Sequence, residues 1–200
     1  NGNVILDYGS GAGAFLNYCN KKGWEVKGVE ADKETRDRVI AETNLDIISP
    51  AQISTLDREK YDIVTLWHVL EHVHQLKDTI GALVNSLKKD GALLIAVPNC
   101  NSLDALNYGK YWAAFDVPRH LYHFRPSDIA KLFKEFNLDV VDTLPMVFDS
   151  YYVSMLSEKY KAGGSGFFGG IVNGFLSNVK GDPKSSFSSQ IYILRKNKAI

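Results

Sequence analysis

The sequence predicts an α/β protein built on a mostly parallel sheet of seven strands, with helices on both faces and a reversed last strand. Three observations lead to this fold class. Apolar runs of strand length alternate with helix-like segments, which is typical of parallel sheets. A glycine-rich turn, 9–13, joins the first strand-like run to a helix-like one. The last apolar run, 188–195, can return as a hairpin partner of 138–147.

The first half of the chain supplies most of the expected elements. Leu76, Ile80, Leu83 and Leu87 recur at about 3.6 residues, so they form the buried face of one helix. Ligands of such sheets bind beyond the carboxyl ends of the strands, so the segments that follow strands are the informative ones. We expect strands at 3–8, 24–29, 45–48, 61–67 and 91–97, and helices at 13–22, 32–42 and 75–88.

The second half is less regular. An aromatic stretch, 98–125, precedes an expected helix at 127–136 and the strand at 138–147. The stretch 149–182 begins with an amphipathic pattern that predicts a helix. Further on, glycines mixed with large apolar residues predict a mobile apolar flap. These glycines are Gly163, Gly164, Gly166, Gly169, Gly170 and Gly174.

The glycine-rich turn and a later carboxylate together indicate a cofactor that contains a nucleoside. Gly9 and Gly11 allow a tight turn from strand to helix and let a ligand approach the backbone. The following helix directs its N-terminal amides at that position. Glu30 ends the second strand-like run, 21 residues after Gly9, which is the spacing at which a carboxylate binds ribose hydroxyls.

Composition bounds the class of protein. Two hundred residues fit one domain, 1–200. Lys+Arg and Asp+Glu balance at 23 each, which argues against nucleic acid as a partner. Cys19 and Cys100 are isolated, which favours a reducing, cytoplasmic location, and no apolar run is long enough to span a membrane. The chain starts almost on its first strand, so we expect an N-terminally truncated fragment.

Four segments in this order resemble the class I S-adenosylmethionine (SAM)-dependent methyltransferases, whose sheet is Rossmann-like. They are Leu-Asp-Tyr-Gly-Ser-Gly-Ala-Gly (6–13), Val-Glu-Ala-Asp (29–32), Tyr-Asp-Ile-Val-Thr-Leu-Trp-His-Val-Leu-Glu-His-Val (61–73) and Lys-Lys-Asp-Gly-Ala-Leu-Leu-Ile-Ala-Val-Pro-Asn (88–99). The Pro-Arg-His segment at 118–120 is similar to a stretch in the bacterial UbiG-like subgroup. The resemblance covers about 3–147.

This resemblance implies SAM as the cofactor and S-adenosylhomocysteine (SAH) as the product. Glu30 would accept the ribose hydroxyls, and Ala31 with the 49–52 loop would flank the adenine. No acidic residue stands at 49–52, so Gln52 or backbone groups would bind the adenine amino group. The implied cofactor-binding residues are Asp7, Tyr8, Gly9, Gly11, Glu30, Ala31, Gln52, Trp67 and His68.

Histidines supply the candidate catalytic groups. Methyl transfer from a sulfonium depends mainly on positioning, but an oxygen acceptor must also lose a proton, and histidine accepts protons near neutral pH. His72 and His120 are the candidates for a base or for orienting the acceptor. Arg119 can position an anionic group of the acceptor, or it can pair with Asp116 or Asp128 and hold its loop.

The segment 68–72 also reads His-x-x-Glu-His, the inverted zinc-protease pattern, but its place after a strand of this sheet argues against a protease. Some small-RNA 2′-O-methyltransferases similar to this fold bind a divalent metal through Glu-x-x-Glu-His and a distant histidine. His68 replaces the first carboxylate here, so no metal site is assigned. Glu71, His72 and His120 would be the ligands of a metal-dependent enzyme.

The sequence therefore predicts a SAM-dependent methyltransferase that acts on a hydroxyl of a small molecule or glycan precursor. The stretch 98–125 would form the acceptor side, and 149–182 a lid that can also contact a membrane surface. Two alternatives stay open. One is an NAD-dependent oxidoreductase, because Gly9, Gly11 and Ala14 also satisfy its glycine pattern. The other is a catalytically silent cofactor-binding domain.

Overall fold

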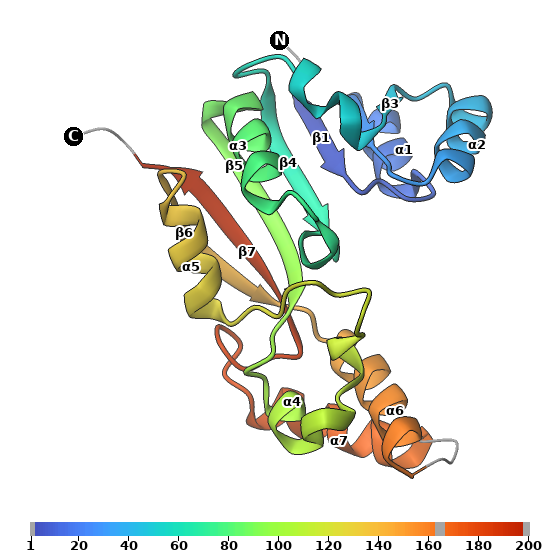
Figure 1. Ribbon diagram of the computed structural model, residues 1–200, viewed down its shortest axis with the longest axis vertical. Coiled ribbons are helices and arrows are strands. Elements are labelled where there is room, and N and C mark those ends of the chain that lie inside the picture. Colours follow the sequence, from blue (N-terminus) through green and yellow to red (C-terminus); the bar gives the residue numbers. More distant parts are fainter. Residues whose placement is uncertain (1–2, 163–166, 198–200) are drawn as a thin grey trace.

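A computed structural model describes residues 3–162 and 167–197. It confirms the predicted fold class: a seven-stranded sheet has the order β3-β2-β1-β4-β5-β7-β6, and β7 runs antiparallel to both of its neighbours (Figure 1). The strands are β1 (Val4–Tyr8), β2 (Glu25–Val29), β3 (Ile47–Ile48), β4 (Tyr61–Trp67), β5 (Leu87–Pro98), β6 (Leu138–Pro145) and β7 (Ser189–Lys196).

Helices pack on both faces of this sheet. Successive strand residues point to opposite faces, and β1 shows the result. Leu6 belongs to a buried cluster with residues of α3 and α5, whereas Ile5 belongs to a second cluster with residues of α1 and α2. The helices are α1 (Ala14–Lys21), α2 (Lys33–Thr43), α3 (Leu76–Ser86), α4 (Leu103–Tyr108), α5 (Pro126–Lys134), α6 (Asp149–Ala162) and α7 (Phe167–Lys180).

The boundary between α3 and β5 differs from the prediction. The helix ends at Ser86 and the strand begins at once with Leu87, which pairs with Tyr61 and is fully buried. The ladder then shifts register, so that Ala92 pairs with Ile63. The Asp-Gly pair at 90–91 is therefore an irregularity inside a strand, and the pattern that indicated a helix end was wrong by a few residues.

The stretch 149–182 forms two helices, α6 and α7, which pack against each other beyond the carboxyl ends of the parallel strands (Figure 1). The expected flap is therefore helical where the structure describes it. A side chain at Gly170 would lie 2.5 Å from Cα of Met155, and one at Gly174 would lie 2.8 Å from Cα of Tyr151. These two glycines permit close contact between helices. Gly163, Gly164 and Gly166 lie outside the described residues.

Gly170→Ala is expected to destabilise the protein by roughly 1–3 kcal/mol, because the added methyl group meets the α6 backbone, which cannot move aside easily. Gly169→Ala is the matched control, since its methyl group would meet only the Glu158 side chain, at 3.0 Å. Both changes favour a helix by about 1 kcal/mol. Urea unfolding of the two variants checks the prediction, and equal stabilities would show that the close contact is unimportant.

None of the helices in the described ranges has the length and apolar character needed to cross a membrane.

Candidate active site

The glycine-rich turn follows β1 closely. The amide of Gly9 donates to the carbonyl of Val29, and Gly9 has a φ of +85°, which other residues rarely adopt. A side chain at Gly9 would also collide with Val69, in the loop after β4. Gly11 has a φ of +51°, and a side chain there would meet no protein atom within 4 Å. The space beside Gly11 is therefore open to a ligand.

Glu30 holds this turn in place through its carboxylate. One oxygen accepts the amide of Gly11 at 2.8 Å, and the other accepts the amide of Asp32 at 2.9 Å. A carboxylate offers about four lone-pair positions, so each oxygen can accept one further hydrogen bond. Glu30 can therefore order the loop and bind two neighbouring ribose hydroxyls.

A cavity of about 690 Å³ opens beside this turn, and we call it the glycine-loop cavity. Its volume lies in the range of small-molecule sites. Four predicted cofactor-binding residues line it, namely Tyr8, Gly9, Glu30 and Ala31. The other lining residues are Val29, Pro50, Ala51, Ile53, Ser54, Val69, His72, Val73, His74, Gln75, Asp78, Thr79 and Ala82.

The remaining predicted cofactor residues lie elsewhere. The Gln52 side chain accepts the amide of Ser49 at 3.1 Å and so caps a short 3-10 helix, η1 (Pro50–Thr55). The Trp67 ring packs edge-on against Phe15, with centroids 5.9 Å apart. Neither residue is among those that line the cavity, so their contacts with a cofactor stay predictions. His68 belongs to the second cavity described below.

Asp7 lies beneath the glycine turn and is 2% exposed. Its carboxylate accepts the hydroxyl of Thr65 at 2.6 Å. Burial raises the pKa of Asp7 from 3.8 to about 6, against the opposite effect of this hydrogen bond, and the charge of Glu30 adds to the increase. Asp7 therefore supports the turn from below and carries an electrostatic cost when it is ionised.

This cost predicts a pH dependence of stability. The pKa of Asp7 is higher in the folded protein than in the unfolded chain. The stabilising contribution of protonated Asp7 to folding is therefore fully present below about pH 4 and is lost as the pH rises through about 6. Asp7→Asn keeps an oxygen for Thr65 but does not titrate. The free energy of unfolding of the wild type, relative to Asp7→Asn, should therefore fall by roughly 1–3 kcal/mol between about pH 4 and pH 7.

Urea unfolding at several pH values measures this difference. Asp62→Asn is the control with the opposite sign, because the hydrogen bond from Lys88 lowers the pKa of Asp62 against the smaller effect of burial. The wild type should gain stability over Asp62→Asn as the pH rises through the acid range. If the stability of the wild type relative to each variant changed with pH in the same direction for both, the raised pKa of Asp7 would be contradicted.

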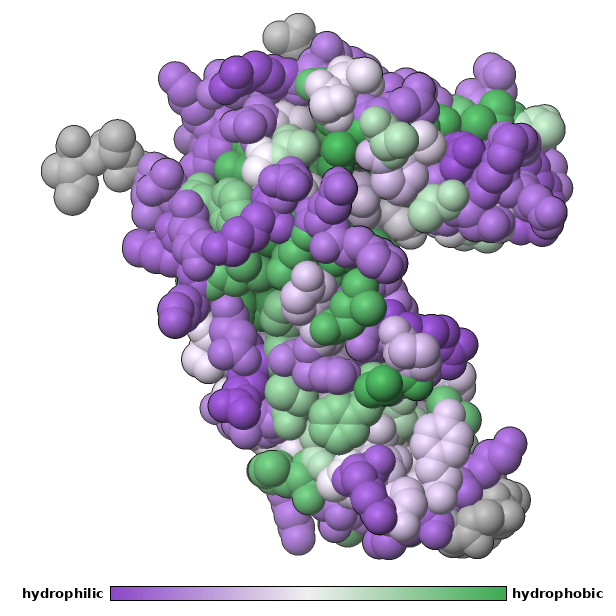
Figure 2. All heavy atoms as spheres, viewed as in Figure 1, coloured by the Kyte–Doolittle hydropathy of each residue, from purple (hydrophilic) through white to green (hydrophobic). Residues whose placement is uncertain are grey.

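A second cavity, of about 380 Å³, lies between the loop after β4, the 113–120 segment and α6, and we call it the histidine cavity. Figure 2 shows the outline of the molecule hollowed between the β1–β3 side and the α6–α7 side. One face of α6 forms a wall, with Tyr152, Val153, Leu156 and Tyr160. The other lining residues are His68, Glu71, Pro98, Ala113, Ala114, Asp116, Arg119, His120, Asp149 and Ser189.

His68 links α6 to the loop after β4. Its Nε2 lies 2.9 Å from a carboxylate oxygen of Asp149, and its Nδ1 lies 3.4 Å from one of Glu71. Burial opposes protonation of His68, but these two carboxylates outweigh it and raise its pKa to about 9. His68 is therefore positively charged at neutral pH, and it fastens the start of α6 to the core.

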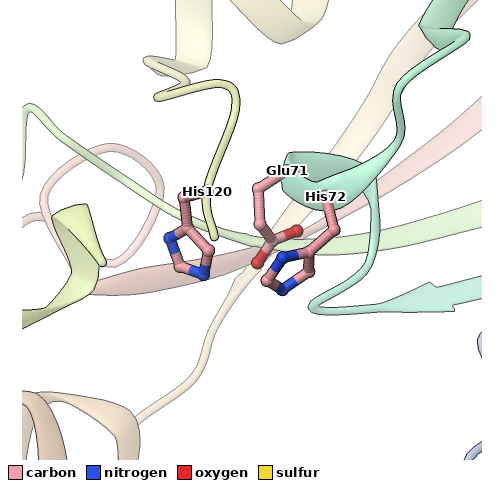
Figure 3. A group of neighbouring side chains, drawn as sticks. All are labelled: Glu71, His72 and His120. Carbon is pink, nitrogen blue, oxygen red and sulfur yellow. The ribbon is translucent and has the colours of Figure 1, made fainter. Parts of the chain in front are cut away.

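Glu71, His72 and His120 converge on one point, and their ligand atoms all lie within 4.8 Å of one another (Figure 3). The first two come from the 3-10 turn η2 (Leu70–His72), and His120 comes from the 98–125 stretch. The carbonyl of Glu71 accepts the amide of Leu121 at 2.8 Å, which joins the two segments. The sequence therefore named three residues that the structure brings together.

Hydrogen bonds fix both imidazoles of this cluster. Nδ1 of His72 lies 2.9 Å from the carbonyl of Arg119, and Nδ1 of His120 lies 2.8 Å from that of Ala114. A carbonyl only accepts, so each Nδ1 carries a proton, and the lone pair of the neutral ring is on Nε2. Burial lowers the pKa of His120, against the opposite effects of the Ala114 carbonyl and the Glu71 carboxylate. His120 is thus neutral at neutral pH.

Glu71 completes the cluster. It is fully buried, and neither carboxylate oxygen has a hydrogen-bond partner among the described residues. A buried carboxylate without such partners is stabilised by a nearby positive charge. Here that charge is on His68, or on a neighbouring histidine that becomes protonated. The cluster can stabilise an imidazolium that forms on a neighbouring histidine, and its oxygen and nitrogen atoms can also ligate a divalent cation.

The cluster also separates the two cavities. His72 lines the glycine-loop cavity, whereas Glu71 and His120 line the histidine cavity. The rings of His72 and His120 meet edge to face, with centroids 4.7 Å apart. A group bound in one cavity and a group bound in the other therefore approach each other at these side chains.

Arg119 lies at the rim of the histidine cavity, where its side chain is 74% exposed. It donates to a carboxylate oxygen of Asp116 at 2.6 Å. The sequence left two roles open for this arginine, and the structure shows the loop-holding pair. It pairs with Asp116 and not with Asp128, which instead accepts the amide of Arg125.

Sequence reasoning missed the α6 wall. Asp149, Tyr152 and Tyr160 come from a stretch that was interpreted as a lid, and the spacing of the two tyrosines, eight residues apart on one helix face, was the available signal. It also missed Val69, whose contact with Gly9 joins two segments far apart in sequence. Within the aromatic stretch 98–125, Tyr108 and Trp112 are buried.

Comparison with known proteins shows the family. Residues 1–143 match the family described as "Methyltransferase domain". The ubiquinone biosynthesis O-methyltransferase of Neisseria meningitidis serogroup C is 25% identical over 175 residues, which cover 80% of this chain and 71% of that protein. The enzyme of the same name from Rickettsia bellii is 24% identical over 156 residues, 72% of this chain and 65% of that protein.

Solved structures share the fold. A SAM-dependent methyltransferase from Archaeoglobus fulgidus superposes with a TM-score of 0.62 at 18% identity, over 98% of this chain and 87% of that one. Phosphoethanolamine N-methyltransferase 2 of Haemonchus contortus, in complex with SAM, gives 0.65 at 15% identity, over 99% of this chain and 49% of that one. With the glycine turn, Glu30 and the sheet order in place, the chain belongs to the class I SAM-dependent methyltransferase domains.

Proposed function

We propose that this domain transfers the methyl group of SAM to a hydroxyl oxygen on a small molecule or glycan precursor. The observation that carries the proposal is the position of the Glu71–His72–His120 cluster between the two cavities. A donor held beside the glycine turn and an acceptor held in the histidine cavity would meet at this cluster. The printed name of the Neisseria relative, an O-methyltransferase, supports oxygen as the acceptor atom.

The residues of the cluster have distinct roles in this proposal. SAM supplies an electrophilic methyl group on a sulfonium. His120 faces the acceptor, and its Nε2 takes the hydroxyl proton because its Nδ1 is already committed to the carbonyl of Ala114. The buried carboxylate of Glu71 stabilises the imidazolium that results. His72, on the donor side, orients the attacking oxygen toward the glycine-loop cavity.

Two segments would position the acceptor. The 98–125 stretch contributes His120 and the rim residue Arg119, which would contact an anionic group of the acceptor. The face of α6 that carries Tyr152 and Tyr160 would close the other side. A lid movement of 149–182 is part of this proposal, as is Gln52 at the adenine. The membrane contact expected of 149–182 concerns the outer face of α7, away from this cavity.

Turnover with pooled acceptors tests the proposal. The protein would be incubated with SAM and with separate pools of phenols, sugars and primary amines, and SAH and methylated products would be measured by mass spectrometry. We expect products from a hydroxyl-bearing pool alone. Methylation confined to the amines would contradict the oxygen acceptor, and SAH binding without turnover in any pool would favour the catalytically silent alternative.

A further inference from the structure

Helix α7 is oriented opposite to an ordinary amphipathic helix. Five of its large apolar residues are exposed, with Phe175 at 54% and Val179 at 64%. We call this row the α7 stripe: Ile171, Val172, Phe175, Leu176 and Val179. They follow the i, i+1, i+4, i+5, i+8 spacing of one helix side. A soluble helix normally buries such a side.

The inward side of α7 is made of small and polar residues. Gly170 and Gly174 contact the backbone of α6, and the Ser177 hydroxyl donates to the buried carboxylate of Asp104 at 3.2 Å. The amide group of Asn173 donates to Glu158 at 2.9 Å. These specific contacts fix the rotation of the helix, so the stripe is held outward by the packing of the protein.

One further apolar residue extends the stripe. The side chain of Asn178 donates to the carbonyl of Val147 at 2.8 Å, so the end of α7 lies beside the start of α6. Phe148, the next residue, is 85% exposed. Figure 1 places α7 at the tip of the molecule that is farthest from β1–β3 and α2, and Figure 2 shows the surface around α2 to be largely hydrophilic. The α7 stripe therefore lies at one tip of the molecule.

Three lysines near the stripe have no ion-pair partner in the described part of the chain. Lys159 and Lys161 end α6 and Lys180 ends α7, and none of the three has a carboxylate within ion-pair distance among the residues that the structure describes. Of the acidic residues in this region, Asp142 pairs with Lys184 and Asp149 with His68. The carboxylates of Glu158 and Asp182 accept hydrogen bonds from uncharged groups, among them Tyr108, Asn173 and Ser185. Within the described ranges, three lysines without an ion-pair partner, against two carboxylates without a cation, leave a small positive excess at this end of the molecule.

We propose that the α7 stripe with Phe148 docks on an anionic lipid surface, into which its apolar side chains insert while Lys159, Lys161 and Lys180 contact the head groups. Interfacial helices combine an apolar side with basic residues in this way. A second copy of the chain is the competing occupant. Docking two copies through this stripe would double the positive excess at the contact, whereas an anionic lipid surface would neutralise it, so the lipid surface fits the charges better.

Vesicle flotation tests the proposal. The probes are vesicles of phosphatidylcholine alone and vesicles of phosphatidylcholine with an equal share of phosphatidylglycerol. The wild type should bind the mixed vesicles and be released as the salt concentration rises. Phe175→Ser with Val179→Ser should lower the partition coefficient at least about tenfold. Replacing the three lysines with Gln should lower it by roughly fivefold for each lysine that reaches the surface.

The matched control is Tyr18→Ser with Ile40→Ser, which removes two exposed apolar residues from α1 and α2 at the opposite side and should leave binding unchanged. Circular dichroism and SAH binding show that each variant is folded. Three results would overturn the proposal: no binding of the wild type to the mixed vesicles, equal binding of the wild type and the Phe175/Val179 variant, or a lipid-free dimer in sedimentation velocity that this variant abolishes.

Discussion

His120→Ala is expected to lower kcat for methyl transfer by about 10²- to 10⁴-fold while leaving the affinity for SAH within about twofold. His120 lines the histidine cavity, and its free Nε2 faces the buried Glu71 and His72, so the substitution removes the proposed proton acceptor. His120 is not among the residues that line the glycine-loop cavity, so cofactor binding should persist. Kinetics with an identified acceptor and calorimetry with SAH separate the two effects.

His123→Ala is the matched control. This histidine lies three residues further along the same stretch and is exposed, and its Nε2 lies 2.9 Å from the carbonyl of Phe115. It lines neither cavity, so its loss should change kcat little. Equal effects of the two alanine substitutions would mean that both histidines only support the loop. Loss of activity in EDTA that a divalent cation restores would instead make Glu71, His72 and His120 metal ligands.

Glu30→Ala is expected to weaken SAH binding by roughly 10- to 100-fold, which corresponds to the loss of a charge-assisted hydrogen bond or two. The substitution removes the acceptor for the ribose hydroxyls. It also releases the amides of Gly11 and Asp32, which the carboxylate holds at 2.8 and 2.9 Å. Calorimetric titration with SAH measures the loss of affinity.

Two further variants distinguish these causes. Glu30→Gln keeps one oxygen and should retain part of the binding, whereas Glu34→Ala, in the first turn of α2, removes a nearby carboxylate without touching the cavity and should bind as the wild type does. If Glu34→Ala lost as much affinity as Glu30→Ala, the effect would come from the negative charge of this region and not from hydrogen bonds of Glu30.

The sequence predicted the sheet and the glycine turn well because both depend on local patterns. Alternation of strands and helices determines the topology, and the glycine turn with Glu30 is a motif of fixed spacing. The cluster was also predictable in part, since Glu71 and His72 are neighbours and His120 follows a later strand. The sequence pattern does not show the hydrogen bond from the amide of Leu121 to the carbonyl of Glu71. This bond brings the 98–125 stretch to the cluster.

Other features were out of reach because they depend on long-range packing. The glycines of α7 were interpreted as a source of mobility, but Gly170 and Gly174 serve close contact with α6, which no local signal reveals. The pairing of His68 with Asp149 joins residues 81 positions apart and makes α6 a wall of the histidine cavity. The resemblance implied Gln52 or backbone groups at the adenine. The structure shows that the Gln52 side chain caps η1, three residues after Ser49, and its contact with the adenine stays a prediction.

Calorimetric titration of the protein with SAH, with NAD in parallel, tests the central claim most directly. We expect SAH to bind with a micromolar dissociation constant, and NAD to show no heat of binding at the same concentrations. Binding of NAD without binding of SAH would contradict the assignment of the glycine-loop cavity and, with it, the methyltransferase reaction.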